Sequence, residues 1–339
     1  MTTVLDRSIF KSLSRRTFRD MFQNNETVIV NGINSIIIGK RAASSCFMIR
    51  LMYDVRIKFE IHFKFNSDDT GSLASMNMRF HPNTEISDEM TIIRHLGSGS
   101  FGDVFHVSVA GKEYALKVGI DIPRGPEQIS IIHNEMNIFQ LLGQNHKHPN
   151  LIQSFPIEFP LGPAILMELG QCTLEDKIKS NTLTFEQTME IILQILSAVE
   201  FLHSIRISHH DLKPDNVLFV DGVPRLFDFG LSYLLETDES FRTHHGGTRG
   251  YNHPDPETNY AQDVFSCCFI LIEMLIGKKV RSRDSMAPKR ILEVSELDIQ
   301  TILRAKGISE ENIEKICRIY RMRTTIEMGY LIKLVESIQ

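Results

Sequence analysis

The sequence predicts an α+β fold, with β structure in the first part of the chain and mainly helices after it. The first observation is a strict alternation over positions 55–65, where every second residue is Val, Ile or Phe and the others are polar. A period of two indicates a strand with one buried and one solvated face. The second observation is that apolar residues recur every three or four positions over 129–139 and 189–199. That spacing indicates helices with one buried side.

The first 88 residues divide into three stretches. Met1–Asn25 is polar with apolar residues at helical spacing, so we expect a frayed terminus or a packed accessory helix, with a membrane-surface helix as the less favoured alternative. Residues 27–65 are interpreted as β structure, and the alternation continues back to position 47, which leaves either a hairpin or one long bent strand. Asn66–Asp88 is rich in Ser, Asp, Asn and Thr and is interpreted as a linker. We therefore expect an accessory region with its linker at 1–85 and a second domain at 86–339.

A glycine-rich stretch follows at positions 96–104 and fits the pattern G-x-G-x-x-G-x-V. A dinucleotide-binding turn shares the glycines, but that turn leads into a helix, whereas residues 104–109 here form a β run. Glycines at such a turn let the backbone approach phosphate groups where any Cβ would intrude. The residues expected to hold phosphate are Leu96, Gly97, Ser98, Gly99, Ser100, Phe101, Gly102, Asp103 and Val104.

Residues 209–218, which read His-His-Asp-Leu-Lys-Pro-Asp-Asn-Val-Leu, bring three kinds of chemistry together. Asp211 is an acceptor that could take a proton from a hydroxyl group, and Lys213 is a cation suited to developing phosphate charge. Asn216 offers an amide oxygen, a hard ligand of the kind that magnesium prefers. Pro214 prevents a regular helix, so the segment is expected to be a shaped loop, followed by a short apolar strand at 217–220.

These two stretches resemble motifs of the eukaryotic-type protein kinases. The second resembles their catalytic loop, H-R-D-L-x-x-x-x-N, with His210 in the place of the usual arginine. Lys213-Pro214 is the form typical of serine/threonine kinases. The matching positions are His209, Asp211, Leu212 and Asn216. The first stretch resembles the nucleotide lid of the same family, and the resemblance covers the chain from about Ile86 onwards.

The resemblance implies further nucleotide-binding residues. Tyr114-Ala115-Leu116-Lys117 matches the lysine motif V-A-I-K, and Lys117 is expected to hold the α- and β-phosphates. Glu135 lies off the core stripe of a helix expected between Pro126 and Gly143 and is the favoured partner of Lys117, with Glu127 as the alternative. The residues expected around the adenine base are Ala115, Met167, Glu168 and Gly170.

The later part of the chain continues the resemblance. Residues 226–230 match D-F-G, so Asp228 is expected to bind magnesium together with Asn216. Residues 247–255 resemble G-T-x-G-Y-x-A-P-E, with His253 for Ala and Asp255 for Glu. Asp255 is expected to pair with Arg323. Asp263-Val-Phe-Ser resembles D-V-W-S, and its aspartate is expected to brace the backbone of the catalytic loop.

Composition excludes several other classes of protein. The net charge of −5 gives no basic field, so no nucleic-acid partner is expected. The longest apolar run, 264–276, is too short to span a bilayer and contains Glu273, so no membrane span is expected. No secretory hydrophobic region follows the start of the chain. The five cysteines form no C-x-x-C pair, which favours reduced thiols in an intracellular protein of the cytoplasm or nucleus.

The resemblance therefore implies a two-lobe kinase fold, with a β-rich N-lobe carrying one helix and a mainly helical C-lobe, preceded by a β-rich accessory region. It implies a serine/threonine protein kinase that uses ATP and Mg and acts on protein substrates. A pseudokinase acting as a nucleotide-binding scaffold is the main alternative, and an enzyme phosphorylating a small molecule is a second. In its divergent sequence and its unusual N-terminal region, the chain resembles kinases of large DNA viruses. This resemblance would place the protein inside a host cell.

Overall fold

The computed structural model describes the backbone over most of the chain and the side chains from residue 90 onwards. The described ranges are 3–5, 27–30, 36–43, 46–53, 57–65, 73–80, 84–85, 90–99, 102–119, 131–145, 147–159, 162–235, 247–248, 250–254, 256, 259–278, 280–281 and 292–338. The chain divides into two units, residues 1–136 with 154–169 and residues 137–153 with 170–339.

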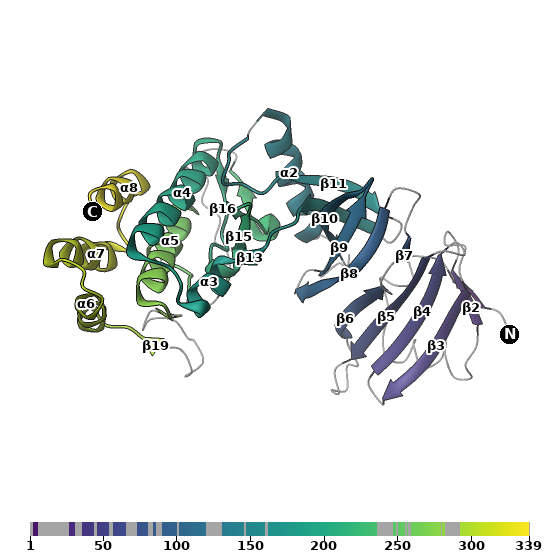
Figure 1. Ribbon diagram of the computed structural model, residues 1–339. Helices are drawn as coiled ribbons and strands as arrows, with labels where there is room; N and C mark the ends of the chain where they lie inside the picture. The colour runs from purple at the N-terminus through teal and green to yellow at the C-terminus, as the bar shows by residue number, and fades with distance from the viewer. Residues whose placement is uncertain are drawn as a thin grey trace. The chain divides into compact units, whose positions relative to one another are not determined.

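The first unit begins with a six-stranded sheet in the order β1-β2-β3-β4-β5-β6 (Figure 1). Apolar residues lie opposite apolar residues in this sheet, as where Phe59 is paired with Leu51 and Ile61 with Ile49. The alternation is therefore divided between two antiparallel strands of a hairpin, and the alternative of one long bent strand is wrong. The strands are β1 Thr3–Leu5, β2 Thr27–Val30, β3 Ile36–Ala43, β4 Cys46–Tyr53, β5 Ile57–Phe65 and β6 Leu73–Phe80.

The linker expected at Asn66–Asp88 is wrong, because strand β6 lies within it and pairs antiparallel with β5. The stretch has the Ser- and Asn-rich composition of a linker, but it also contains an alternation with a period of two. In this alternation the residues between are polar and every second residue is apolar: Ala74, Met76, Met78 and Phe80. Pairing with a neighbouring strand outweighs a weak local preference. Strand β7, Thr84–Glu85, also lies in this stretch and pairs with β8 of the next sheet. Most of Met1–Asn25, where a frayed terminus or a packed helix was expected, lies outside the described residues. Its described residues, 3–5, form strand β1.

A second sheet of the first unit has the order β11-β12-β10-β9-β8-β7. Its inner residues are apolar, and Phe105, Leu116 and Ile165 are fully buried. Gly119 ends the central strand and must be glycine, since a Cβ there would lie 2.6 Å from side-chain atoms of Ile132. The strands are β8 Met90–Gly99, β9 Gly102–Val109, β10 Lys112–Gly119, β11 Ser154–Phe159 and β12 Gly162–Glu168.

Helix α2, Ile131–Asn145, gives its first turns to the first unit and the rest to the second unit. The helix stop expected at Gly143 is wrong, because the helix continues for two more residues. Glycine in a helix costs only about 0.8–1.0 kcal/mol relative to alanine. Burying a leucine side chain such as that of Leu142, which is 7% exposed, is worth about 1.5–3 kcal/mol. Packing of the buried face therefore outweighs the local preference of one glycine.

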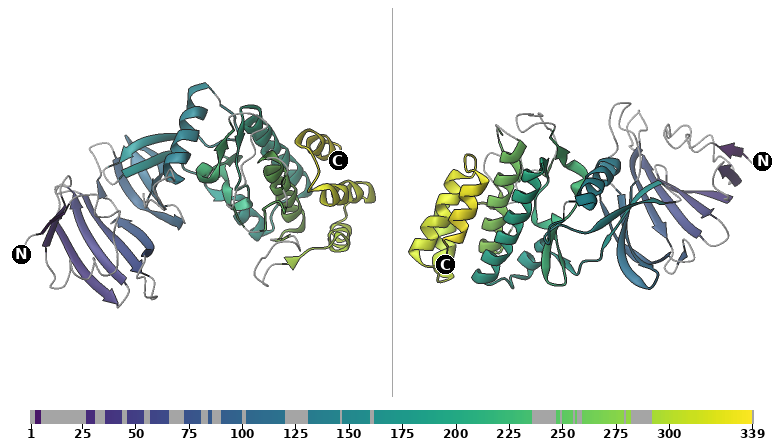
Figure 2. Two further views of the ribbon diagram at one scale, coloured as in Figure 1. Left: turned by 180° about the vertical axis from the view of Figure 1, so that it is seen from behind. Right: turned by 90° about the horizontal axis from the view of Figure 1, so that it is seen from above.

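The second unit is mainly helical, and α4 and α5 pack side by side in its core (Figure 2). Thr173 and Thr184 cap α3 and α4 with capping boxes, in which the cap side chain and the side chain at the third helical position each accept a hydrogen bond from the other residue's backbone N–H. The helices are α3 Leu174–Ser180, α4 Phe185–Ser204, α5 Asn259–Ile276, α6 Glu296–Ala305, α7 Glu310–Met322 and α8 Met328–Glu336. None of the helices in the described ranges is long and apolar enough to cross a membrane.

Short strands complete the second unit and frame its loops. Strands β15 and β16 form a hairpin that β13 extends, β14 pairs with β17, and β18 is parallel to β19. The strands are β13 Cys172–Thr173, β14 Ile207–Ser208, β15 Val217–Val220, β16 Val223–Leu226, β17 Tyr233–Leu234, β18 Val280–Arg281 and β19 Leu292–Glu293. Strand β15 is the short apolar strand that was predicted after the loop at 209–218.

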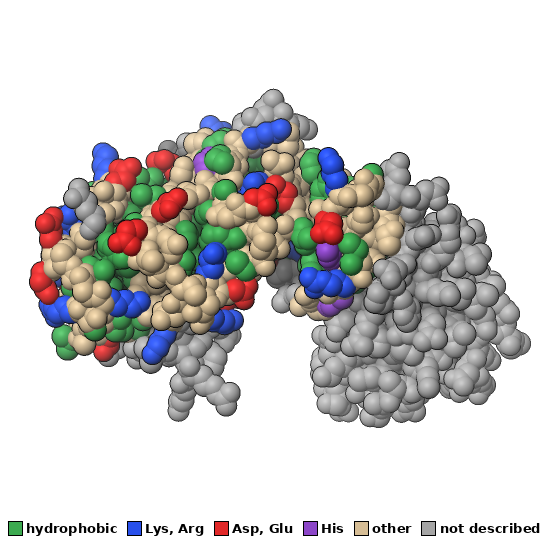
Figure 3. Space-filling view, viewed as in Figure 1, with side chains coloured by type: hydrophobic (Ala, Val, Ile, Leu, Met, Phe, Trp, Pro, Cys, Tyr) green, Lys and Arg blue, Asp and Glu red, His purple; other side chains and the backbone are tan. Residues whose placement is uncertain are grey.

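Charged side chains of both signs cover the C-terminal helices (Figure 3). Arg304 at the end of α6 makes two hydrogen bonds, of 2.7 and 2.9 Å, to the Glu310 carboxylate at the start of α7. Arg321 of α7 lies 2.9 Å from Glu296 of α6. These ion pairs are exposed, so each contributes only about 0–1 kcal/mol, and the two helices are held together mainly by their buried leucine and isoleucine side chains.

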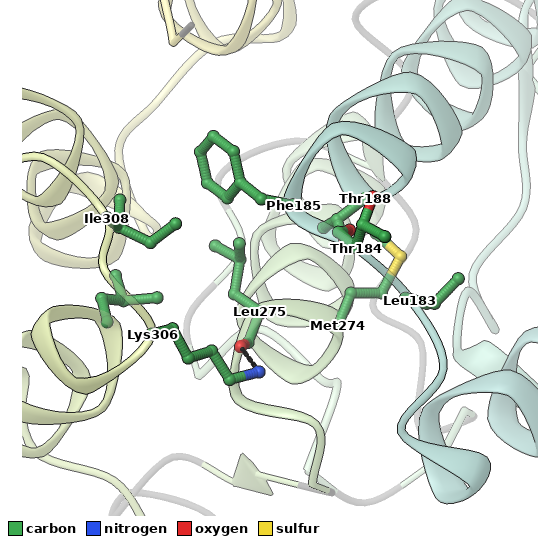
Figure 4. Close-up of a pocket in the computed structure, with 9 residues that line it drawn as sticks. Leu183, Thr184, Phe185, Thr188, Met274, Leu275, Lys306 and Ile308 are labelled. Atoms are coloured by element: carbon green, nitrogen blue, oxygen red, sulfur yellow. Dashed lines mark hydrogen bonds between the residues drawn. The ribbon is translucent and has the colours of Figure 1, made fainter.

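A cavity of about 170 Å³ lies where α4 begins and where α5 and α6 end (Figure 4). Its walls include Phe185, Met274 and the fully buried Leu303. At its edge the Lys306 ammonium donates a 2.7 Å hydrogen bond to the carbonyl oxygen of Leu275. The lysine thereby satisfies one of the carbonyl groups that the end of a helix leaves unpaired. Burial lowers the pKa of Lys306.

We predict that Leu303→Ala destabilises the protein by about 2–5 kcal/mol, because it removes buried apolar atoms and enlarges a cavity that is already present. Leu297→Ala on the same helix is the control, since Leu297 is 68% exposed and its loss should change stability by no more than about 0.5 kcal/mol. Urea unfolding of the two variants and the parent chain measures the difference. Equal losses in both variants would contradict the packing described for α6.

Candidate active site

The Asp211 carboxylate is the centre of a polar cluster in the second unit. It accepts hydrogen bonds from Lys213 Nζ at 2.6 Å, from Asn216 Nδ2 at 3.0 Å and from Thr248 Oγ1 at 2.7 Å. Lys213 Nζ also donates to Thr248 Oγ1 at 2.8 Å. The three residues predicted as catalytic, Asp211, Lys213 and Asn216, therefore lie in direct contact. Thr248 was not predicted as a member of this cluster, although the G-T-x-G-Y pattern around it was a usable signal.

Local structure explains how the loop brings these side chains together. Pro214 begins a single 3₁₀ turn, η2 (Pro214–Asn216), at a first position that suits its fixed φ and its missing N–H group. The turn places Asn216 directly before strand β15, so that its side chain points back to Asp211, where Nδ2 also donates to the Asp211 carbonyl oxygen at 2.8 Å. The loop is thus closed on itself by the same amide that contacts the carboxylate.

Asp263 at the start of α5 holds the backbone of this loop, which confirms the brace predicted from the sequence. Its two carboxylate oxygens accept hydrogen bonds from the backbone N–H groups of His209 at 2.7 Å and His210 at 2.8 Å. Burial opposes its ionisation, but hydrogen bonding from His203 and the neighbouring histidines hold the pKa of Asp263 below its ordinary value. His210 has a φ of 63°, an uncommon left-handed conformation for a histidine. The brace supports that conformation.

The Asp228 segment lies beside the same loop because of the β15–β16 hairpin. Asn216 precedes β15 and Asp228 follows β16, so the two residues lie at the same end of the hairpin, where Phe227 N donates to Asn216 O at 3.2 Å. Phe229 is fully buried, with its ring centroid 5.2 Å from that of Phe139 and 4.9 Å from that of His209. The anchored phenylalanine fixes the position of Asp228, whose φ of 65° is left-handed.

Asn216 and Asp228 suit a divalent cation of the hard class. Both hydrogen bonds of Asn216 Nδ2 go to Asp211, which orients the amide so that Oδ1 is the atom that would meet a metal. An amide oxygen and a carboxylate are ligands that Mg²⁺ accepts while keeping waters and phosphate oxygens as its other ligands. No group of three or more His, Cys, Asp or Glu side chains gathers as a metal site among the described residues.

Lys117 and Glu135 form a buried ion pair in the first unit. The Lys117 Nζ lies 2.6 Å from Glu135 Oε2, and the two residues are 8% and 0% exposed. Lys117 is placed on β10, paired with Val104 of β9 and Ile165 of β12. Glu135 was the favoured partner in the sequence, and the alternative Glu127 lies outside the described residues.

The glycine-rich stretch forms the hairpin of β8 and β9. Gly97 is paired with Val104 and Ser98 with Asp103, while Ser100 and Phe101 lie outside the described residues. Gly102 must be glycine, because its φ is 151° and a Cβ there would lie 2.3 Å from the carbonyl oxygen of Val118. Leu96 is 37% exposed. The strand–turn–strand geometry is therefore the one that was predicted from the flanking β run.

The residues predicted around an adenine base are described within their own units. Met167 of β12 is paired with Ala115 of β10, and both are 5% exposed. Glu168 ends β12. Gly170 begins the longer stretch of the second unit, 170–339, and packs against Leu218, where a Cβ would lie 2.2 Å from the leucine Cγ. The roles of these four residues in binding a base stay predictions.

The segment after Thr248 is anchored by buried polar contacts. Tyr251 donates a 2.7 Å hydrogen bond from its hydroxyl to Glu273, and burial raises the pKa of this tyrosine. His253 Nε2 lies 2.9 Å from the carbonyl oxygen of Thr324. Asp255, the predicted partner of Arg323, lies outside the described residues. The Arg323 guanidinium lies 4.3 Å from the centre of the Tyr320 ring.

The fold and these contacts define a class of protein, and comparison with known sequences agrees with it. The family model of the protein kinase domain matches residues 90–327. This is well over half of the chain, which therefore belongs to the protein kinase family.

Individual kinases are similar over part of the chain. The chain is 31% identical to the carbon catabolite-derepressing protein kinase of Candida glabrata over 54% of its own length and 31% of that protein. It is 30% identical to mitogen-activated protein kinase 15 of Caenorhabditis elegans, over 58% of its length and 45% of that protein. It is 26% identical to the interferon-induced, double-stranded RNA-activated protein kinase of Rattus norvegicus, over 66% of its own length and 47% of that protein. The chain spans less than half the length of each of these three relatives.

Membership of the family confirms the predicted two-part fold, with a β-sheet N-lobe and a helical C-lobe. Proteins of this family generally use ATP and a divalent metal. Among the described residues, Cys172, Cys267, Cys268 and Cys317 are free thiols. Burial raises the pKa of Cys268 to about 12.

Proposed function

We propose that this protein is a serine/threonine kinase that transfers the γ-phosphoryl group of ATP to Ser or Thr hydroxyls of protein substrates, with Mg²⁺ as its metal. The observation that carries the proposal is the Asp211 cluster, in which one carboxylate contacts Lys213, Asn216 and Thr248. Lys213 followed by Pro214 is the serine/threonine form of the loop. Relatives whose names include serine/threonine-protein kinase support the same assignment.

Each residue of the cluster has a role in this reaction. Asp211 orients the incoming hydroxyl group and accepts its proton. Lys213 has three N–H donors, and its contacts with Asp211 and Thr248 leave a third donor for the charge that develops on the transferred phosphoryl group. Asn216 and Asp228 would hold Mg²⁺, which when bound would neutralise charge on the phosphates. Catalysis in this reaction class is mainly positioning and electrostatics.

A pseudokinase scaffold is the main competing proposal. Its usual mark is the loss of the lysine, the catalytic aspartate or the D-F-G aspartate, and Lys117, Asp211 and Asp228 are all present. An enzyme that phosphorylates a small molecule is the second alternative. The contact of Thr248 with Asp211 argues against it, because it ties the segment that resembles a peptide-docking loop directly to the catalytic carboxylate.

The test is to incubate the full chain with radiolabelled ATP, Mg²⁺ and a panel of generic proteins, followed by phospho-amino-acid analysis. We expect labelled phosphoserine and phosphothreonine. Predominant phosphotyrosine would contradict the specificity. Nucleotide binding without transfer to any protein would favour the scaffold.

We also predict that the rate depends little on phosphorylation of residues 231–246, the stretch between the D-F-G match and Gly247 that corresponds to the activation segment of kinases. In most kinases the arginine at the position of His210 pairs with a phosphorylated residue of that segment and orders it. His210 is 6% exposed, and burial lowers its pKa, so its imidazole is neutral at physiological pH. A neutral imidazole also lacks the two-pronged geometry of a guanidinium group.

The measurement is the initial rate before and after phosphatase treatment, and in a variant with Thr237, Ser240 and Thr243 all changed to Ala. We expect changes of less than about twofold, since the buried histidine supplies no charge for a phosphate. A loss of about tenfold, equivalent to about 1.4 kcal/mol in the barrier, would show that the segment is a phosphorylation switch. In that case another cation, such as Arg242, would pair with the phosphate.

A further inference from the structure

Three polar side chains meet across the glycine-rich hairpin in an arrangement that the family motif does not require. The Ser98 hydroxyl donates a 2.5 Å hydrogen bond to Asp103 Oδ1, and His95 Nε2 lies 3.2 Å from the same oxygen. The Ser98 hydroxyl also lies 3.3 Å from His95 Nε2. The three groups therefore form a closed triangle that joins β8 to β9 beside the glycine turn.

A β-bulge explains how His95 and Ser98 reach the same carboxylate. Residues three positions apart in a regular strand point to opposite faces. Here His95 is paired with Phe105 and Gly97 with Val104, so Leu96 is an extra residue in β8. The extra residue brings His95 and Ser98 to one face of the hairpin, the face that also carries Asp103.

The burial of Asp103 makes these contacts energetically important. Asp103 is 1% exposed, whereas His95 and Ser98 are exposed. A buried carboxylate is costly unless hydrogen-bond donors compensate for the lost water. Ser98 and His95 are such donors, and both belong to the strand opposite Asp103. The hydrogen bonds that compensate for the burial of the Asp103 carboxylate therefore also hold the two strands in register at this point.

The triangle does not have the geometry of a nucleophilic serine. In that arrangement one imidazole nitrogen contacts the serine and the other contacts the aspartate. Here both contacts of His95 use Nε2, and the serine hydroxyl donates directly to Asp103. The ring cannot relay a proton between the other two groups, so the arrangement is suited to holding the strands and not to chemistry.

We propose that Ser98, Asp103 and His95 form a hairpin clamp that holds β8 and β9 in the register at which the glycine-rich hairpin binds the triphosphate of ATP. This inference rests on the proposed function, because the phosphate-binding role of the hairpin belongs to the kinase reaction. Glycine residues have more conformational freedom than other residues, and ordering a backbone rich in glycine on binding costs affinity. The hairpin clamp reduces this cost in advance. The three side chains are thus positioning residues for the phosphates.

The test compares two ligands in the full chain by isothermal titration calorimetry, which suits a protein without tryptophan. The ligands are the non-hydrolysable β,γ-imido analogue of ATP with Mg²⁺ and adenosine, which lacks phosphates. For Ser98→Ala and Asp103→Ala we expect the Kd of the analogue to rise about tenfold, a change of about 1.4 kcal/mol, while the Kd of adenosine stays within about twofold. Ser98→Thr, which keeps the hydroxyl, should restore binding of the analogue.

Ser108→Ala is the matched control, because Ser108 lies on β9 at the other end of the hairpin. If Asp103→Ala fails to fold, Ser98→Ala alone decides the matter, since Ser98 is exposed and its change leaves Asp103 its contact with His95. Equal losses for both ligands, no loss for the analogue, or tighter binding of the analogue in Asp103→Ala would overturn the hairpin clamp. Selective loss of the analogue in a protein that transfers no phosphate would support the clamp and contradict only the proposed reaction.

Discussion

Changing Asp211 to Asn should lower the initial rate of phosphoryl transfer by about 10²–10³-fold, the effect typical of removing one positioned electrostatic group. In the parent chain Oδ2 accepts hydrogen bonds from both Lys213 and Asn216, and Oδ1 accepts one from Thr248. An amide can present only one oxygen to these three donors, and its NH₂ group would face a donor. The variant therefore loses the proton acceptor and the orientation of its neighbours together.

The measurement is the initial rate at saturating ATP, with thermal unfolding to show that the variant is folded. Asp221→Asn is the control, since Asp221 is exposed in the β15–β16 turn with a φ of 51°, a conformation that asparagine tolerates. We expect the control to keep the parent rate. An Asp211→Asn protein of unchanged stability that retained most of its activity would contradict the assignment of the catalytic residue.

Local patterns were sufficient to predict much of the fold and of the site. The alternation at 55–65 predicted β5, and the β run after Val104 predicted a strand where a dinucleotide-binding turn would have a helix. In each case the local preference and the tertiary structure favour the same conformation. The cluster of Asp211, Lys213 and Asn216 was predictable for the same reason, because its members lie within six residues of one loop.

Features that depend on long-range contacts were missed. Strand β6 has a linker-like composition, and its pairing with β5 determines its structure. Thr248 lies 37 residues after Asp211, and only the folded chain shows its contact with that carboxylate. The clamp at Ser98 requires a bulge whose extra residue no local pattern indicates. The location of the protein in the cell, its possible viral origin and the role of residues 1–85 stay predictions.

Changing Lys117 to Met should lower the rate by about 10²-fold, since the ammonium group is expected to hold the α- and β-phosphates. Methionine keeps the apolar length of the side chain and removes only the charge. The variant should also lose stability, because it leaves the fully buried Glu135 without its cation, and breaking a buried ion pair costs about 3–5 kcal/mol. The two effects need separate measurements.

A double-mutant cycle with Glu135→Gln separates them. Glutamine carries no charge, so the double variant should be more stable than the sum of the two single losses predicts, because the residues are in contact. Its rate should nevertheless stay low, since no cation remains to hold the phosphates. Lys112→Met is the control on the same strand, as Lys112 is exposed at the start of β10. Recovery of the rate together with the stability in the double variant would show that Lys117 acts on the fold and not on the nucleotide.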